Sequence, residues 1–125
     1  VGKSKRLEAF KISLEDQNVE GSIQYRAHVQ DIGWQSYVNA DEIAGTVGRK
    51  KAVEAISIKL TGELAEKYDI YYRVHSANFG WLGWAKNGES AGSQGYSRQA
   101  EAVEIRLVEK GKMAPGNTKN CFYKR

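Results

Sequence analysis

The sequence predicts an all-β fold in which similar units are arranged about a pseudo-threefold axis. Three observations support this expectation: one motif recurs at a fixed spacing, apolar residues alternate with polar ones, and helical patterns are scarce. The 125 residues have the length of a single domain. We expect a β-prism-like body, with a β-trefoil as the alternative, because three units together bury apolar faces that one unit leaves exposed. An open tandem array is the competing geometry.

Internal repetition is the main organising feature of the chain. Residues 23–60 (repeat one) and 70–107 (repeat two) align without a gap at an offset of 47 residues. Both copies contain Tyr-Arg-x-His, then Gly-Trp, then Ala-Gly-Thr/Ser-x-Gly, and finally Glu-Ala followed by alternating apolar residues. A pattern of this length that returns at one offset predicts two structural units of the same kind.

A third copy is present in two pieces. Residues 5–14 match the end of the repeat, and residues 121–125 resemble its start. We therefore predict one domain, residues 1–125, in which the N- and C-terminal strands complete a third unit. The specific expectation is that Phe10–Leu14 pairs in one sheet with Cys121–Lys124.

Alternation of apolar and polar residues predicts the strands of each repeat. Ile23–Val29 and Ile56–Leu60 follow the period of two that is typical of half-buried strands, and the equivalent segments of repeat two do the same. The only helix-like stretch is Gly62–Tyr68, for which we expect about one turn. Lys112–Thr118 has the composition of a loop.

Composition and charge argue against several classes of protein. The net charge of +4 is spread along the chain, so it does not predict nucleic-acid binding. No apolar run approaches the ~20 residues of a membrane-spanning helix, and we expect no membrane insertion. Cys121 is the only cysteine and no Cys/His cluster has zinc-binding spacing, so we predict no metal and no cofactor. The abrupt start at Val1, without a signal peptide, leads us to expect part of a larger multidomain protein.

Patterns typical of enzymes occur only out of context. Gly88–Gly92 matches Gly-x-Ser-x-Gly, but a nucleophile elbow needs a strand, a turn and a helix in an α/β sheet, which this chain does not offer. The carboxylates of Glu15–Asp16 and Asp41–Glu42 lie in turn-like polar stretches with no sign of a glycosidase pair. We therefore predict a non-catalytic protein.

Aromatic residues are the first candidates for contact with a ligand. Trp34 and Trp81 each follow a glycine, and their ring faces could stack on the C–H groups of a sugar, although a tryptophan repeated in every unit also suits a symmetric core. Three residues further on, Tyr37 and Trp84 stay aromatic but differ in kind. Because such variation suits a ligand-binding face, we expect Trp84 to be the best single stacking residue.

Histidine and arginine recur beside these rings. His28 and His75 lie on the polar side of their predicted strands, together with Arg26 and Arg73. Such a face could hydrogen-bond sugar hydroxyls or bind a carboxylate through the fork of the guanidinium. A histidine that bonds a loop carbonyl in each repeat is the structural alternative.

The glycine-bracketed loops are the last candidates. Thr46 and Ser93 stand at equivalent positions in these loops, which could present N–H groups and a hydroxyl to a ligand or serve as plain turns. Lys51 precedes Glu54 by three residues, and the equivalent basic and acidic residues recur in repeat two. We expect an ion pair within each repeat, with a structural role.

The repeated motif resembles the ChW family, clostridial hydrophobic repeats with a characteristic tryptophan. The resemblance rests on His28–Gln30, Gly33–Trp34, Gly45–Gly48 and Glu54–Ile56, and it is weaker in repeat two, where Ser93 replaces threonine. The family implies a secreted or surface-attached protein of a Gram-positive, often clostridial, bacterium. Its repeats stand beside hydrolases, lysins or adhesins and are regarded as attachment modules.

The residues and the resemblance together predict a lectin-like binding module. We expect the partner to be a glycan or glycoprotein, from a cell wall or a host mucin, with one site in each complete repeat. The alternative is an adhesin domain that recognises a host or envelope protein through its surface. Binding of that second kind would survive deglycosylation of the partner and would not be competed by free sugars.

Overall fold

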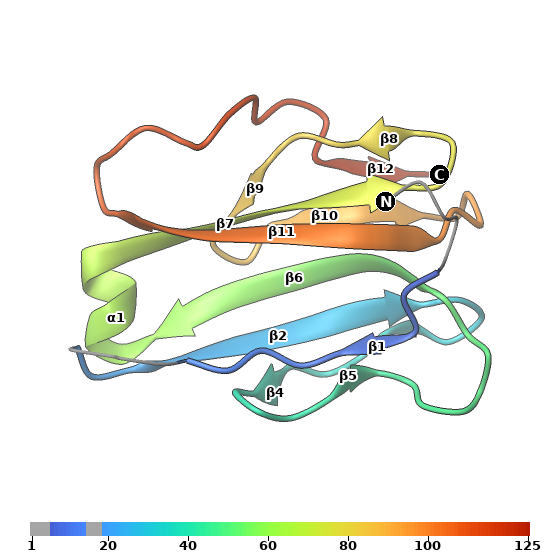
Figure 1. Ribbon diagram of the computed structural model, residues 1–125, viewed down its shortest axis with the longest axis horizontal. Coiled ribbons are helices and arrows are strands. Elements are labelled where there is room, and N and C mark those ends of the chain that lie inside the picture. Colours follow the sequence, from blue (N-terminus) through green and yellow to red (C-terminus); the bar gives the residue numbers. More distant parts are fainter. Residues whose placement is uncertain (1–5, 15–18) are drawn as a thin grey trace.

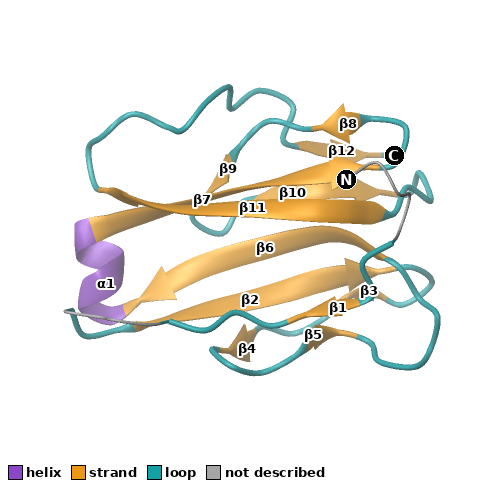
Figure 2. Cartoon of the chain, in the orientation of Figure 1, coloured by secondary structure: helices purple, strands orange, loops and turns teal. Residues whose placement is uncertain are grey.

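The computed structural model describes residues 6–14 and 19–125 and is nearly all β, as the sequence predicts (Figure 1, Figure 2). Lys5, the first residue of the predicted N-terminal half-repeat, and Glu15–Asp16 lie outside the described residues. The described elements are, in chain order, β1 (Ala9–Phe10), β2 (Ser22–Val29), β3 (Gly33–Trp34), β4 (Val38–Asn39), β5 (Ala44–Gly45), β6 (Val53–Thr61), α1 (Gly62–Lys67), β7 (Tyr68–Ser76), β8 (Gly80–Trp81), β9 (Ala85–Lys86), β10 (Ser90–Gln94), β11 (Ala100–Glu109) and β12 (Phe122–Lys124).

The two repeats are built to the same plan. In repeat one the long strands β2 and β6 pair antiparallel, and the short strands β3 and β4 also pair with β2. In repeat two β7 and β11 form the equivalent pair, and β8 and β9 pair with β7. The registers correspond as well, because His28 lies opposite Trp34 and His75 lies opposite Trp81.

The turns that close these units use the same left-handed backbone positions. Asp31 and Asn78, both with a φ of 65°, occupy equivalent places in the turns that follow β2 and β7. Gly33 and Gly80 follow two residues later, also with positive φ. Aspartate, asparagine and glycine tolerate this conformation better than other residues, so the turn chemistry repeats together with the strand pattern.

Repeat two docks onto repeat one through β10. This strand pairs antiparallel with β6 and places Gly92 opposite Ala55. Strand β5 pairs in the same way with β1, where Gly45 lies opposite Ala9. A Cβ atom on Gly92 would lie 2.3 Å from the backbone oxygen of Glu54, so the close approach of the two backbones requires glycine.

Leu7 connects the starts of two distant strands. Its N–H donates to the backbone oxygen of Ala100 at 2.8 Å, and its own oxygen accepts from the N–H of Val53 at 2.7 Å. Leu7, Val53 and Ala100 occupy equivalent positions, because each directly precedes the Glu-Ala pair in its copy of the motif. The three copies therefore meet at one point, which is compatible with the expected threefold arrangement.

The predicted pairing of the two terminal segments is wrong. β12, within the predicted segment Cys121–Lys124, pairs parallel with β10, whereas β1 pairs with β5 in a separate two-stranded sheet. The C-terminal strand instead buries aromatic rings against both repeats. Phe122 lies 6.4 Å from Trp34 and Tyr123 stacks on Phe79 at 4.9 Å, measured between ring centroids. Burial of these rings decides which strand β12 joins, and the similarity of a few residues on which the prediction rested does not.

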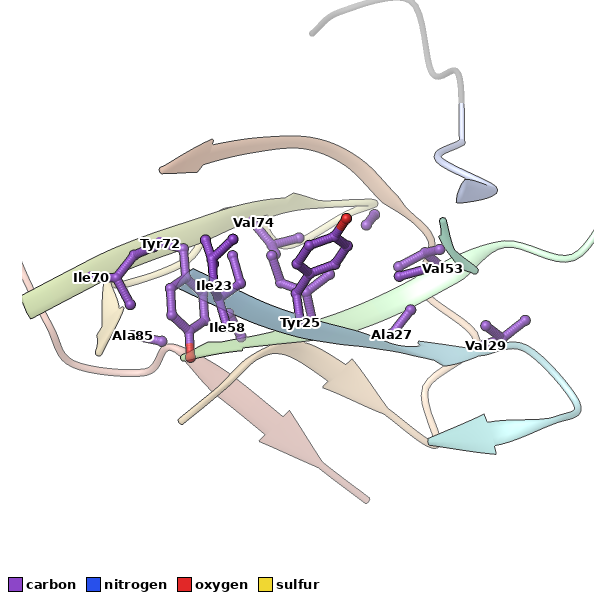
Figure 3. Packing of buried hydrophobic residues seen from close by; sticks show 14 residues of the cluster. Ile23, Tyr25, Ala27, Val29, Val53, Ile58, Ile70, Tyr72, Val74 and Ala85 are labelled. Atoms are coloured by element: carbon purple, nitrogen blue, oxygen red, sulfur yellow. The ribbon is translucent and has the colours of Figure 1, made fainter. Parts of the chain in front are cut away.

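The core lies between the two long hairpins, as Figure 3 shows. The alternate residues Ile23 and Tyr25 of β2 and Ile70 and Tyr72 of β7 are almost completely buried there, which confirms the predicted period of two. The hydroxyls of Tyr25 and Tyr72 donate to the backbone oxygens of Glu42 and Glu89, so each buried phenol has a partner. Helix α1 links β6 to β7, close to the helical stretch that the sequence predicts.

Candidate functional site

An open pocket of about 430 Å³ lies at the junction between the two repeats. It is formed where the turn after β2 in repeat one meets the end of β10 and the loop that follows it in repeat two. Both segments lie at the same end of the molecule (Figure 1). The lining residues are His28, Gln30, Asp31, Ile32, Gly33 and Glu54 of repeat one and Gln94, Gly95 and Ser97 of repeat two.

Trp34 links the two repeats beside this pocket. Its indole Nε1–H donates to Oε1 of Gln94 at 3.2 Å, a bond between residues 60 positions apart in the chain. The ring is half-buried, with Phe122 of β12 near it. This bond holds the indole beside the pocket, and part of the indole surface stays accessible to a ligand.

His28 and Glu54 form a buried polar pair on the wall of the pocket. His28 Nδ1 lies 3.1 Å from Glu54 Oε1, and both side chains are about nine-tenths buried. The imidazole also meets the ring of Trp34 edge to face, with centroids 5.3 Å apart. Burial raises the pKa of Glu54, His28 opposes this rise, and the charge of Asp31 adds to it. The carbonyl partner that the sequence analysis considered for His28 is thus replaced by a carboxylate.

Arg26 extends the site along β2. Its guanidinium carbon lies 4.6 Å from the ring centroid of Trp34 and 4.9 Å from that of Tyr37. The Tyr37 hydroxyl lies 2.7 Å from Ser57 Oγ, and Lys59 Nζ lies 4.2 Å from the same ring. The rings and cations therefore alternate along one face of the hairpin and keep Trp34 in a fixed orientation.

Repeat two carries the same group of residues, but its second aromatic ring, Trp84, is more enclosed than Tyr37. Arg73 lies 4.5 Å from the ring of Trp81 and 4.9 Å from that of Trp84, and it also donates to Glu104 at 3.1 Å. His75 Nδ1 lies 3.2 Å from a carboxylate oxygen of Glu101, but without the geometry of a hydrogen bond. The set of residue types recurs, as the sequence predicts, but its surroundings do not.

Trp84 is only 5 % exposed. The loop before β12 covers it: its backbone N–H donates to the oxygen of Asn117 at 2.8 Å, and a Cβ on Gly116 would lie 3.0 Å from its Nε1. Its ring is therefore not available for stacking on a ligand, contrary to the expectation that it is the principal stacking residue. The sequence could not show this, because the covering loop follows the repeat and has no counterpart in repeat one.

The two glycine-bracketed loops lie in different surroundings. The N–H of Thr46 donates to the oxygen of Glu8 at 2.9 Å, which holds this loop against the N-terminal segment. Ser93 is fully buried between β6 and β12. Neither residue lines the pocket; the adjacent Gln94 and Gly95 do. The pocket residues of repeat one thus meet the glycine-bracketed loop of repeat two, and not the equivalent loop of repeat one.

The predicted ion pair within repeat one is also wrong. Lys51 Nζ bonds to Asp31 Oδ2 at 2.9 Å, and Glu54 bonds to His28 instead. The strand register explains this, because Glu54 follows Val53 at a β-bulge opposite His28 and Val29 and its side chain turns towards the imidazole.

The family model for ChW, clostridial hydrophobic W, matches residues 28–62 and 75–109, which together make up more than half of the chain. The protein belongs to this family. No curated protein and no solved structure gives a significant match.

The junction between the ChW repeats contains pocket residues that the sequence analysis missed, chiefly Asp31, Glu54 and Gln94. The only signal for Asp31 was the left-handed position that it shares with Asn78. The only signal for Glu54 was the repeated Glu-Ala pair. Nothing in the sequence joins Gln94 to Trp34.

In the described part of the chain no three His, Cys, Asp or Glu side chains gather as a metal site. None of its helices has the length and apolar character to cross a membrane.

Proposed function

We propose that this ChW protein is a non-catalytic module that binds carbohydrate in the pocket between its repeats. The observation that carries the proposal is Trp34, which stands half-buried beside a pocket lined by amides, two carboxylates and a serine hydroxyl. Protein sites for sugars combine an aromatic face, which packs on C–H groups, with planar polar side chains that bond the hydroxyls.

The size and chemistry of the pocket suit a small saccharide unit. A volume of about 430 Å³ falls within the usual range of ligand sites, which is roughly 300–1,000 Å³. The amides of Gln30 and Gln94 offer both donors and acceptors, and Asp31 offers acceptors on the rim. The exposed charge of Asp31 is balanced by Lys51, which favours a neutral ligand.

The same contacts support the proposal of a binding role without catalysis. The two carboxylates of the pocket have different partners, since Glu54 bonds to His28 and Asp31 bonds to Lys51. Neither is therefore free to act as the nucleophile of a glycosidase pair. Membership of the ChW family supports a repeat binding module. We propose that its ligand is a glycan of the cell wall or of host mucin, met by a secreted or surface-attached protein of a Gram-positive bacterium.

Glycan-array screening followed by calorimetry tests this proposal. Trp34→Ala and Gln94→Ala should each weaken binding of any array hit by about tenfold or more, as is typical for central contacts. Their matched controls are Trp81→Ala and Val47→Ala, which change the equivalent positions of the other repeat and should leave the affinity within about twofold. Thermal unfolding of all four variants separates lost contacts from lost folding. A glycan that binds Trp34→Ala and Gln94→Ala as tightly as the wild type would show that the site lies elsewhere.

The exposed apolar residues of repeat one favour a second candidate function. Ile32 on the pocket lining is 47 % exposed, and Ile43 and Val47, on either side of β5, are 54 % and 72 % exposed. Apolar side chains of this kind can serve a protein-binding adhesin surface. Binding to a host or envelope protein that resists deglycosylation and free sugars, and that is lost in Ile43→Ser and Val47→Ser, would favour this function over the first.

A further inference from the structure

Strand β11 exposes apolar side chains on the side that faces the core. Ile105 is 39 % exposed and Leu107 is 47 % exposed, and they lie opposite Tyr72 and Ile70 in the register with β7. Directly opposed residues of an antiparallel pair project from the same face, so both side chains belong to the face that carries the core. The equivalent of Ile105 in repeat one, Ile58, is completely buried.

One edge of β11 lacks a partner strand. β11 ends its sheet and pairs with β7 alone, whereas the equivalent strand β6 has β2 on one edge and β10 on the other. β1 likewise receives β5. Among the strands of residues 6–14 and 19–125, none pairs with the outer edge of β11. A long strand with an open edge and exposed apolar residues is a template for pairing with another strand.

The two docked strands show what this edge accepts. Gly45 packs against the backbone of Glu8–Ala9, and Gly92 packs against Glu54–Ala55, with hypothetical Cβ atoms only 2.4 and 2.3 Å from the glutamate oxygens. In both cases an Ala-Gly-Thr/Ser strand lies on a Glu-Ala sequence at the start of the last strand of a repeat. β11 contains the same sequence, Glu101–Ala102, with no strand upon it.

We propose that the outer edge of β11 binds the Ala-Gly-Thr/Ser strand of one further ChW repeat, namely the repeat whose last strand is β1. The hydrogen bond from Val53 to the oxygen of Leu7 accompanies docking of β5, from the same repeat as Val53, on β1. The bond from the N–H of Leu7 to the oxygen of Ala100 joins the equivalent positions of the repeat that ends in β1 and of repeat two. By the same geometry, the repeat that contains Leu7 docks its own strand on β11.

A second copy of this chain is a poorer occupant of the edge. Both of its Ala-Gly-Thr/Ser strands are already engaged, β5 by β1 and β10 by β6 and β12. The sequence before Leu7 points to the same repeat. Val1–Lys3 reads Val-Gly-Lys and matches Val47–Arg49, Val-Gly-Arg, at the offset of 46 residues that relates Glu8–Ala9 to Glu54–Ala55.

An extended chain tests the proposal directly. A copy of residues 22–46 is placed before Val1, so that one additional repeat is completed, and Cys121→Ser removes the native thiol. Maleimide labelling at Ile105→Cys should be about tenfold or more slower in the extended chain than in the 125-residue chain with the same substitutions, because docking buries this position. Labelling at Arg106→Cys, on the opposite face of β11, should proceed equally fast in both chains.

A third chain controls for the added length. It carries the same extension with Gly45→Val in the copied segment, which brings a side chain against the backbone of Glu101 and should restore fast labelling at Ile105→Cys. Equal protection by this chain, or no protection in a folded extended chain, would overturn the proposal.

If the extended chain does not fold, a peptide of residues 41–49 is titrated into the 125-residue protein. Slower amide exchange confined to β11 and its neighbour β7 supports the proposal. Unchanged exchange at saturating peptide contradicts it, and the Gly45→Val peptide serves as the matched control.

Discussion

His28 and Glu54 are joined by a hydrogen bond between neighbouring strands, with Nδ1 3.1 Å from Oε1 and both side chains buried. The equivalent residues of repeat two, His75 and Glu101, approach to 3.2 Å but remain more accessible and lack hydrogen-bond geometry. The same two residue types therefore form a tight pair at the junction of the repeats and a looser one where no further repeat is docked.

This difference predicts unequal effects of removing the two carboxylates. Glu54→Ala leaves the buried Nδ1 of His28 without its partner and should lower the free energy of unfolding by about 1–3 kcal/mol. Glu101→Ala should cost distinctly less, because His75 Nδ1 makes no hydrogen bond to Glu101 that the substitution would remove. Urea unfolding at neutral pH measures both values. Equal losses would show that the buried bond at the junction has no special weight.

Arg26 is expected to act through its planar guanidinium rather than through its charge alone. It lies between the rings of Trp34 and Tyr37, and a lysine cannot stack on both. Arg26→Lys should therefore destabilise the protein by about 1 kcal/mol, the usual size of such contacts. A double-mutant cycle with Trp34→Phe measures the coupling, and additive effects of the two substitutions would rule out the stacking contribution.

Gly92 and Gly48 both have positive φ but differ in what surrounds them. A Cβ on Gly92 would lie 2.3 Å from the oxygen of Glu54, whereas one on Gly48 would have nothing within 4 Å. Gly92→Ala should cost about 3 kcal/mol or more, because overpacking adds to backbone strain. Gly48→Ala should cost only the strain, about 1 kcal/mol. Thermal unfolding compares the two, and similar losses would mean that the contact between β10 and β6 yields easily.

Asp69 should make the stability of the protein depend on acid pH. Hydrogen bonds from Lys110 and Asn87 lower the pKa of its carboxyl below the ordinary value of 3.8. Its stabilising contribution is therefore complete above that ordinary value and is lost as the pH falls through the lowered pKa of the folded state. Asp69→Asn should lower the free energy of unfolding by about 1–2 kcal/mol at neutral pH.

The difference between wild type and Asp69→Asn should shrink as the pH falls below the ordinary aspartate value. Denaturant unfolding at a series of pH values measures it. Glu63→Gln, at an exposed pair within α1, is the matched control and should show little change at any pH. A difference between wild type and Asp69→Asn that stays constant down to strongly acid pH would contradict the assignment of Asp69.

Local sequence patterns determined the secondary structure and the repetition. The period of two in Ile23–Val29 follows from one buried and one polar face, and it needs no knowledge of what covers the buried face. Aspartate, asparagine and glycine at the left-handed positions specify the turns in the same local way. The aromatic, histidine and arginine residues of the candidate site could also be predicted, because they recur at equivalent places in both repeats.

The pairing of distant elements was decided only in the tertiary structure. Gln94 meets Trp34 because β10 crosses to β6 of the preceding repeat, and Trp84 is covered because the loop before β12 folds over it. The C-terminal strand likewise joins β10 rather than β1. Each of these outcomes is a competition between distant surfaces for burial, and such a competition leaves no periodic trace in the sequence of either partner.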